Sequence, residues 1–71
     1  MNANLLKGAI VSKGFSIEQF LENLKEQGIY LSKTSFYRKI RGESDFYRKE
    51  ILAIGKELEL DNATLINIFF T

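Results

Sequence analysis

The sequence predicts an all-α fold, a small bundle of five short helices that forms one domain over residues 1–71. Apolar residues recur at helical spacing in separate segments, and small polar residues or glycines stand where those helices would begin or end. Strand signals are weak, because only "GIYLS" at residues 28–32 alternates, and it is short and close to a helix start. Seventy-one residues suit a single small core.

The first two helices follow from apolar spacing and from the residues that flank it. A first short helix, ending before Gly14, is indicated by the apolar residues Leu5, Leu6, Ala9 and Ile10. A second helix has the i, i+3, i+4, i+7 spacing of an amphipathic helix at Ile17, Phe20, Leu21 and Leu24. Ser16 is its expected N-cap and Gly28 its expected end.

The remaining three helices are predicted in the same way. Ser32 is expected to cap a third helix over about residues 33–41, which Gly42 ends and in which Phe36 and Ile40 form a narrow apolar stripe. A polar loop around residues 43–45 leads into a fourth helix with the apolar residues Ile51, Leu52, Ile54 and Leu58. Asp61 is expected to cap a final short helix with Leu65, Ile66 and Phe69.

Composition excludes several classes of function. The chain has no cysteine and no histidine, which removes disulfides, the common transition-metal ligands and the usual neutral-pH acid–base residue. We therefore expect no catalytic residues, no metal or cofactor, no small-molecule substrate and no enzyme activity. No apolar run reaches 18 residues and no signal-peptide pattern is present, so we expect a cytoplasmic protein without a membrane partner.

The net charge of +1 is unevenly distributed along the chain. Residues 33–49 contain six Lys or Arg against Glu43 and Asp45, a net charge of +4. Residues 16–32 have a net charge of −2 and residues 50–71 a net charge of −3. Because local rather than total charge attracts a polyanion, the central segment is the candidate for binding nucleic acid.

The predicted third helix would present polar side chains to the groove of a DNA duplex. With Phe36 and Ile40 toward the core, a rotation of about 100° per residue turns Thr34, Arg38 and Arg41 outward. The major groove admits a helix, and arginine can bind guanine there through two hydrogen bonds. Phosphate contacts are expected from Lys39, Ser44 and Arg48 or Lys49. The candidate DNA-binding residues are Lys33, Thr34, Ser35, Tyr37, Arg38, Lys39, Arg41 and Ser44.

The same residues also allow a simpler interpretation. A charged outward helix face is commonly a solvated surface, and Tyr37 could cover the small core while its hydroxyl stays in water. What favours the binding interpretation is the arrangement around the segment: a helix, a short connection that contains a glycine, and a second helix opened by a serine. This is the pattern of a helix-turn-helix.

The segment "SKTSFYRKIRGESDF" resembles the recognition-helix region of phage repressor and Cro-type helix-turn-helix proteins, particularly those of phages of Gram-positive bacteria. The residues that match the family pattern are Ser32, Ser35, Phe36, Tyr37, Arg38, Lys39, Ile40 and Gly42. The stretches "NLLKGAIVSKGFSIEQF" and "LINIFF" resemble the family as well.

This resemblance implies a lambda-repressor-like five-helix bundle and a sequence-specific, DNA-binding transcriptional regulator. The third helix would enter the major groove of double-stranded DNA, with Lys33 and Thr34 as the primary base contacts and Tyr37 and Arg38 following. The chain departs from the family pattern twice. Phe36 lies twelve positions after Leu24, which requires a longer second helix or an expanded turn, and Ile17 stands where related proteins often use Gln.

Two further expectations concern partners. The acidic ends of the chain and its small net charge favour an alternative function, a protein–protein interaction module such as an antirepressor or assembly factor. The segment "LINIFF" has more apolar surface than one helical stripe can bury. With Leu65, Ile66 and Phe69 toward the bundle, Ile68 or Phe70 would point outward and support a homodimer, formed in solution or only on DNA. Alternatively, both residues fold back over the first helix.

Overall fold

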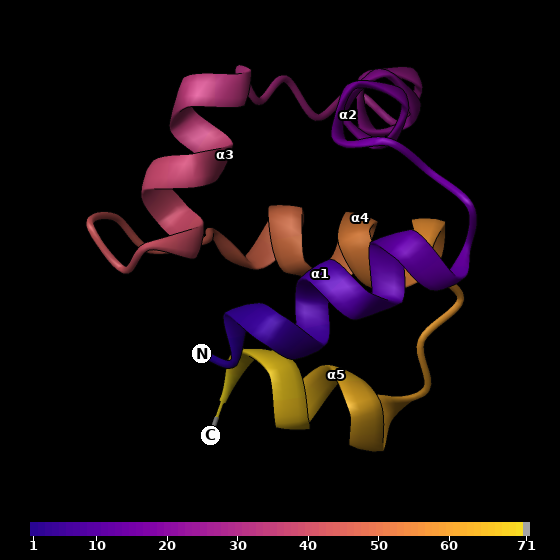
Figure 1. The fold of residues 1–71 in the computed structure, drawn as a ribbon, viewed down its shortest axis with the longest axis vertical. Helices are drawn as coiled ribbons and strands as arrows, with labels where there is room; N and C mark the ends of the chain where they lie inside the picture. The colour runs from indigo at the N-terminus through magenta and orange to yellow at the C-terminus, as the bar shows by residue number, and fades with distance from the viewer. Residues whose placement is uncertain (71) are drawn as a thin grey trace.

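The computed structural model describes residues 1–70, and in that range it contains five α-helices and no strand (Figure 1). The helices are α1 (Ala3–Ser12), α2 (Ile17–Glu26), α3 (Lys33–Ile40), α4 (Arg48–Glu57) and α5 (Asn62–Phe69). The predicted all-α fold with five helices is therefore confirmed. Among the described residues, no helix has the length and apolar character needed to cross a membrane.

Local sequence signals set the helix ends. Asn2, Ser16, Ser32 and Asp61 each accept a hydrogen bond from the backbone N–H three residues later, at 3.1, 3.1, 3.1 and 2.8 Å respectively. Such caps satisfy donors that the first helical turn leaves without an intrahelical partner. Three of these four caps were predicted from the sequence, whereas at the start of α4 the Glu50 side chain accepts a hydrogen bond from the N–H of the N-cap residue Tyr47.

The hydrophobic core is built around the completely buried ring of Phe36 in α3. The ring centroid of Phe36 lies 5.9 Å from that of Phe20 and 6.1 Å from that of Phe46, both in tilted or edge-on geometry. Phe46 in turn makes an edge contact with Phe69 at 5.5 Å. The buried hydrophobic residues are Leu6, Ile10, Phe20, Leu21, Leu24, Ile29, Leu31, Phe36, Ile40, Ala53, Ile54, Leu58 and Ile68.

Helix packing leaves α3 at the edge of the bundle (Figure 1). α2 packs against both α3 and α4, and α1 packs against α5. The two ends of the described chain meet where the Asn2 N–H donates a hydrogen bond to the Ile68 carbonyl at 2.6 Å. α1 and α5 pack together on the opposite side of the molecule, and no other helix covers the outward face of α3.

The connection between α2 and α3 settles which of two predicted alternatives holds. α2 has only ten residues and ends at Glu26, so the extra length lies in an expanded turn over residues 27–32. Gly28 adopts a left-handed conformation (φ +83°) as the chain leaves α2. Ile29 and Leu31 are buried, while Tyr30 between them is exposed. The alternation anchors the turn to the core and fixes α3 relative to α2.

The orientation predicted for α5 is partly wrong. Ile68 is completely buried, whereas Ile66 is 53% exposed and points away from the bundle. Phe70 is 67% exposed, in agreement with the prediction that Ile68 or Phe70 faces outward. "LINIFF" has apolar residues around most of the helix, with Asn67 as its one polar residue, so its sequence allowed several apolar stripes, and the stripe that contains Ile68 is the one buried where α5 packs against α1.

Candidate nucleic-acid interface

The outward face of α3 presents the polar side chains that helical spacing predicts. Thr34, Arg38 and Arg41 are exposed, and Ser35 and Tyr37 are half-buried on the flanks. The side chains of Arg38 and Arg41 are 58% and 56% exposed. Because Phe36 and Ile40 are buried in the core on the opposite face of α3, this polar surface is directed outward.

An ion pair connects the first residue of α3 to α2. Lys33 donates a hydrogen bond to the Glu18 carboxylate. That hydrogen bond lowers the pKa of the Glu18 carboxyl and raises the pKa of the Lys33 ammonium. Both side chains are more than half exposed, and pairs of this kind stabilise a protein only weakly. Lys33 can therefore exchange Glu18 for another anion at small cost.

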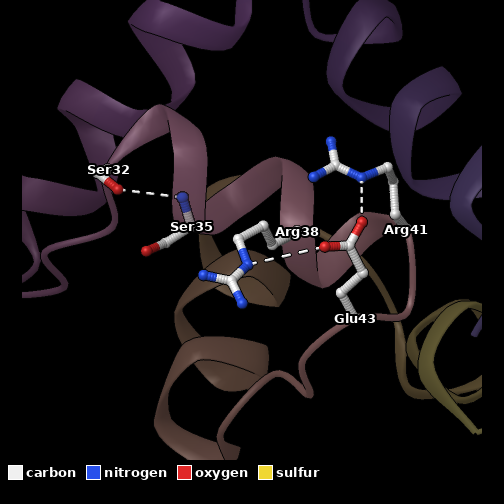
Figure 2. Close-up of polar contacts among 5 residues, drawn as sticks. All are labelled: Ser32, Ser35, Arg38, Arg41 and Glu43. Atoms are coloured by element: carbon white, nitrogen blue, oxygen red, sulfur yellow. Dashed lines mark hydrogen bonds and ion pairs between the residues drawn. The ribbon is translucent and has the colours of Figure 1, made fainter.

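A second carboxylate lies between two arginines at the end of α3 (Figure 2). Glu43 Oε2 accepts a hydrogen bond from Arg41 Nε at 2.6 Å, and Glu43 Oε1 lies 3.8 Å from Arg38 Nε. The hydrogen bond from Arg41 holds the pKa of the Glu43 carboxyl below its ordinary value and raises the pKa of the Arg41 guanidinium. Glu43 is thus ionised at neutral pH, hydrogen-bonded to Arg41 and within ion-pair distance of Arg38.

Lys39 does not take part in this exposed face, which corrects the expectation that it contacts phosphate. Its side chain is 7% exposed, and its Nζ donates a hydrogen bond to Glu50 Oε1 of α4 at 2.6 Å. The same Glu50 oxygen accepts the Tyr47 N–H at 2.8 Å, and the Lys39 Nζ lies 4.1 Å from the centroid of the Tyr47 ring. The physical reason is position, because residue 39 lies beside Ile40 on the flank of α3 that faces α4.

The remaining predicted phosphate contacts lie around the same surface. Ser35, Arg38, Lys39 and Ser44 line a shallow depression of about 120 Å³ between α3 and the loop that follows it. Its two hydroxyls and its guanidinium are groups that can donate hydrogen bonds to phosphate oxygens. Arg48 and Lys49, in the first turn of α4, are exposed.

The structure adds three carboxylates that were not identified as site residues from the sequence. Glu18, Glu43 and Glu50 each pair with a candidate cation, and only Glu43 is near its partners in the chain. Gly42 could have predicted the position of Glu43 from the sequence, because a left-handed glycine after a helix turns the next residue back toward the last helical turn. Glu18 and Glu50 depend on tertiary packing.

Among residues 1–70, no group of three or more His, Cys, Asp or Glu side chains could hold a metal ion. Comparisons of the chain with protein-family models, with curated proteins and with solved structures found no match. We therefore infer the function of this chain from the geometry and charge of its own residues.

Proposed function

We propose that this protein is a cytoplasmic, sequence-specific regulator of transcription that binds double-stranded DNA, of the phage repressor and Cro type. It would act by occupying an operator and would perform no chemistry. The observation that supports this most is the outward face of α3, where Thr34, Arg38 and Arg41 are exposed on a helix at the edge of the bundle. The net charge of +4 over residues 33–49 would attract the DNA backbone.

In this proposal α2, the expanded turn and α3 form the helix-turn-helix, and α3 lies in the major groove. Its exposed N-terminal residues, Lys33 and Thr34, meet base edges first, as do recognition helices in general. Tyr37 and Arg38 follow one turn later, and arginine is suited to the N7 and O6 acceptors of guanine. Lys33 leaves Glu18 to make its contact.

Phosphate contacts would orient the helix in the groove. Ser35 and Ser44 flank the depression beside Arg38, where their hydroxyls can donate to phosphate oxygens. Arg48 and Lys49 lie at the N-terminal end of α4, which follows the same loop. Hydrogen bonds of this kind set the position of a protein on DNA without distinguishing sequences.

A homodimer completes the proposal, formed in solution or on DNA. Leu52 is 54% exposed and Phe70 is 67% exposed, and together with Leu65 they line an apolar groove between α4 and α5. An exposed apolar patch on a small domain commonly marks an interface. Helix-turn-helix dimers gain affinity by engaging two half-sites about one turn of DNA apart.

The proposed function is tested by selecting bound sequences from a random DNA pool and measuring affinity for the selected site. We expect Arg38→Ala and Thr34→Ala to weaken binding, because a good two-bond base contact contributes about 1–3 kcal/mol of discrimination. Lys56→Ala is the matched control, since Lys56 is exposed in the last turn of α4, which runs away from α3 (Figure 1). Equal affinity of both α3 variants and the parent would contradict the recognition-helix assignment.

The dimer is tested separately by sedimentation at high protein concentration, with and without a palindromic selected site. We expect two protomers per palindrome, and Phe70→Ser should reduce that assembly while leaving a monomer that melts like the parent. A monomer under both conditions, with one protein per site, would contradict the dimer. Complete absence of DNA binding would instead favour a protein–protein interaction module.

A further inference from the structure

The first four helices end in the same backbone motif. In each, the second residue beyond the helix adopts a left-handed conformation, with φ of +78°, +83°, +81° and +54° at Gly14, Gly28, Gly42 and Glu59. The next residue then donates its N–H to a carbonyl five residues earlier, at 2.9–3.3 Å. This Schellman motif brings the side chain after the left-handed residue back over the last helical turn, where a hydrophobic contact usually forms.

Three of the four motifs follow that rule, and α3 does not. The returning residues of α1, α2 and α4 are Phe15, Ile29 and Leu60, each buried or packed against the core. The returning residue of α3 is Glu43, whose side chain is 49% exposed. A departure from a local rule that the rest of the molecule obeys is typical of a functional position.

The backbone places Glu43 directly against the interface. Its N–H donates to the Arg38 carbonyl at 2.9 Å, and Gly42 donates to the Lys39 carbonyl at 3.1 Å, so the carboxylate is returned to the last turn of α3. Both ion pairs involve the Nε atoms of the arginines, at 2.6 Å for Arg41 and 3.8 Å for Arg38. Figure 2 shows that the terminal nitrogens of both guanidinium groups point away from Glu43.

We propose that Glu43 is a positioning residue that holds Arg38 and Arg41 by their inner edges, so that the outer edge of Arg38 contacts a guanine. This inference depends on the proposed DNA-binding function. The Nε of Arg38 faces the Glu43 carboxylate at 3.8 Å, an ion pair beyond hydrogen-bond distance, and both terminal nitrogens of Arg38 remain to meet the N7 and O6 acceptors of guanine side by side. An arginine side chain that is held in place before binding also loses less conformational entropy when it binds DNA.

A second role for Glu43 would have the opposite effect on affinity. If the carboxylate only neutralised positive charge, its removal would strengthen binding to every duplex, because fewer negative charges would oppose the phosphates. A positioning role instead predicts weaker binding to the selected site. Asp45 supplies the matched control, since it is an exposed carboxylate in the same loop.

The experiment compares Glu43→Ala with Asp45→Ala on the selected site and on an unrelated duplex of equal length. We expect both variants to bind the unrelated duplex slightly more tightly and to the same extent. On the selected site, Glu43→Ala should lose about tenfold in affinity and its preference for guanine at one position, the size expected for one two-bond base contact. Glu43→Gln, which keeps an acceptor oxygen for Arg41 Nε, should recover part of that loss.

Two outcomes would overturn the inference, and they are distinguishable. If the parent selects a sequence but Glu43→Ala behaves like Asp45→Ala on both duplexes, Glu43 only neutralises charge and the DNA-binding proposal stands. If the parent selects no sequence from the pool, the proposed function fails and the positioning role fails with it. Thermal melts of all three variants verify folding, which an exposed loop residue should hardly affect.

Discussion

Replacing Lys39 by Met tests whether this lysine is a structural ion-pair partner or a phosphate contact. Methionine keeps an unbranched apolar chain of similar length against the aromatic rings and removes only the ammonium group. The ammonium lies 2.6 Å from Glu50 Oε1, and both side chains are 7% exposed. The substitution would therefore leave the Glu50 carboxylate buried without its cation.

The expected loss of stability follows from that geometry. Removing one partner of a buried ion pair costs about 3–5 kcal/mol. Glu50 keeps its hydrogen bond from the Tyr47 N–H at 2.8 Å, which favours the lower end, about 3 kcal/mol. A chain of this length has a total stability of roughly 4 to 11 kcal/mol. The Lys39→Met variant should thus lose a quarter or more of it.

The assay is thermal unfolding at pH 7, followed by circular dichroism. For a domain of this size about 3 kcal/mol corresponds to a lowering of Tm by roughly 12–24 °C. Lys49→Met is the control, because Lys49 is exposed, and its Tm should stay close to that of the parent. Adding Glu50→Gln to Lys39→Met should recover most of the loss, since no buried charge remains uncompensated. An unchanged Tm for Lys39→Met together with weaker DNA binding would refute the structural role.

Three further predictions concern the fold. Phe36→Ala should unfold or nearly unfold the domain, because removing a completely buried Phe costs about 3–5 kcal/mol; a Tm within a few degrees of the parent would contradict its core position. Gly42→Ala should lower the free energy of unfolding by about 1–2 kcal/mol, because alanine disfavours the left-handed conformation of residue 42, while the added Cβ would meet no other atom within 4 Å. An unchanged urea midpoint would exclude that conformation. Hydrogen bonds from Lys or Arg lower the folded-state pKa of the Glu18, Glu43 and Glu59 carboxyls below their ordinary value of 4.5. The stability that these pairs contribute to the folded protein is therefore present above about pH 4.5 and is lost as the pH falls through the folded-state pKa values. Urea midpoints should therefore fall steadily below about pH 4.5, and a flat profile down to pH 3 would argue against these pairs.

Most of the fold could be predicted from the sequence because its determinants are local. Ser16, Ser32 and Asp61 cap helices within three residues of their own position, and the stripe of Phe36 and Ile40 sets the orientation of α3. These signals need no knowledge of tertiary packing, and they gave the helix order and the central core residues correctly.

The errors arose where the local pattern allows more than one answer. In α5 the apolar residues surround the helix, and only contact with α1 buries Ile68 and exposes Ile66. Lys39 was expected to contact phosphate, yet its partner is Glu50 of α4, eleven residues later in the chain. Tertiary contacts decide both cases.

The candidate interface was predictable in outline but not in its ion pairs. The outward positions of Thr34, Arg38 and Arg41 follow from helical geometry alone. The positions of the carboxylates that pair with the cations do not, because an acidic side chain can face solvent as readily as it can contact a lysine or an arginine. For Glu43, the left-handed Gly42 before it supplies the missing constraint.

The salt dependence of affinity for a selected DNA site tests the DNA-binding proposal most directly. Only Lys39 of the six cations in residues 33–49 is buried, which leaves five exposed cations: Lys33, Arg38, Arg41, Arg48 and Lys49. If three or four of them neutralise phosphates, the logarithm of the binding constant should fall against the logarithm of salt concentration with a slope of about −2.7 to −3.6 per protomer. A slope near zero, or no measurable binding at low salt, would contradict the proposal.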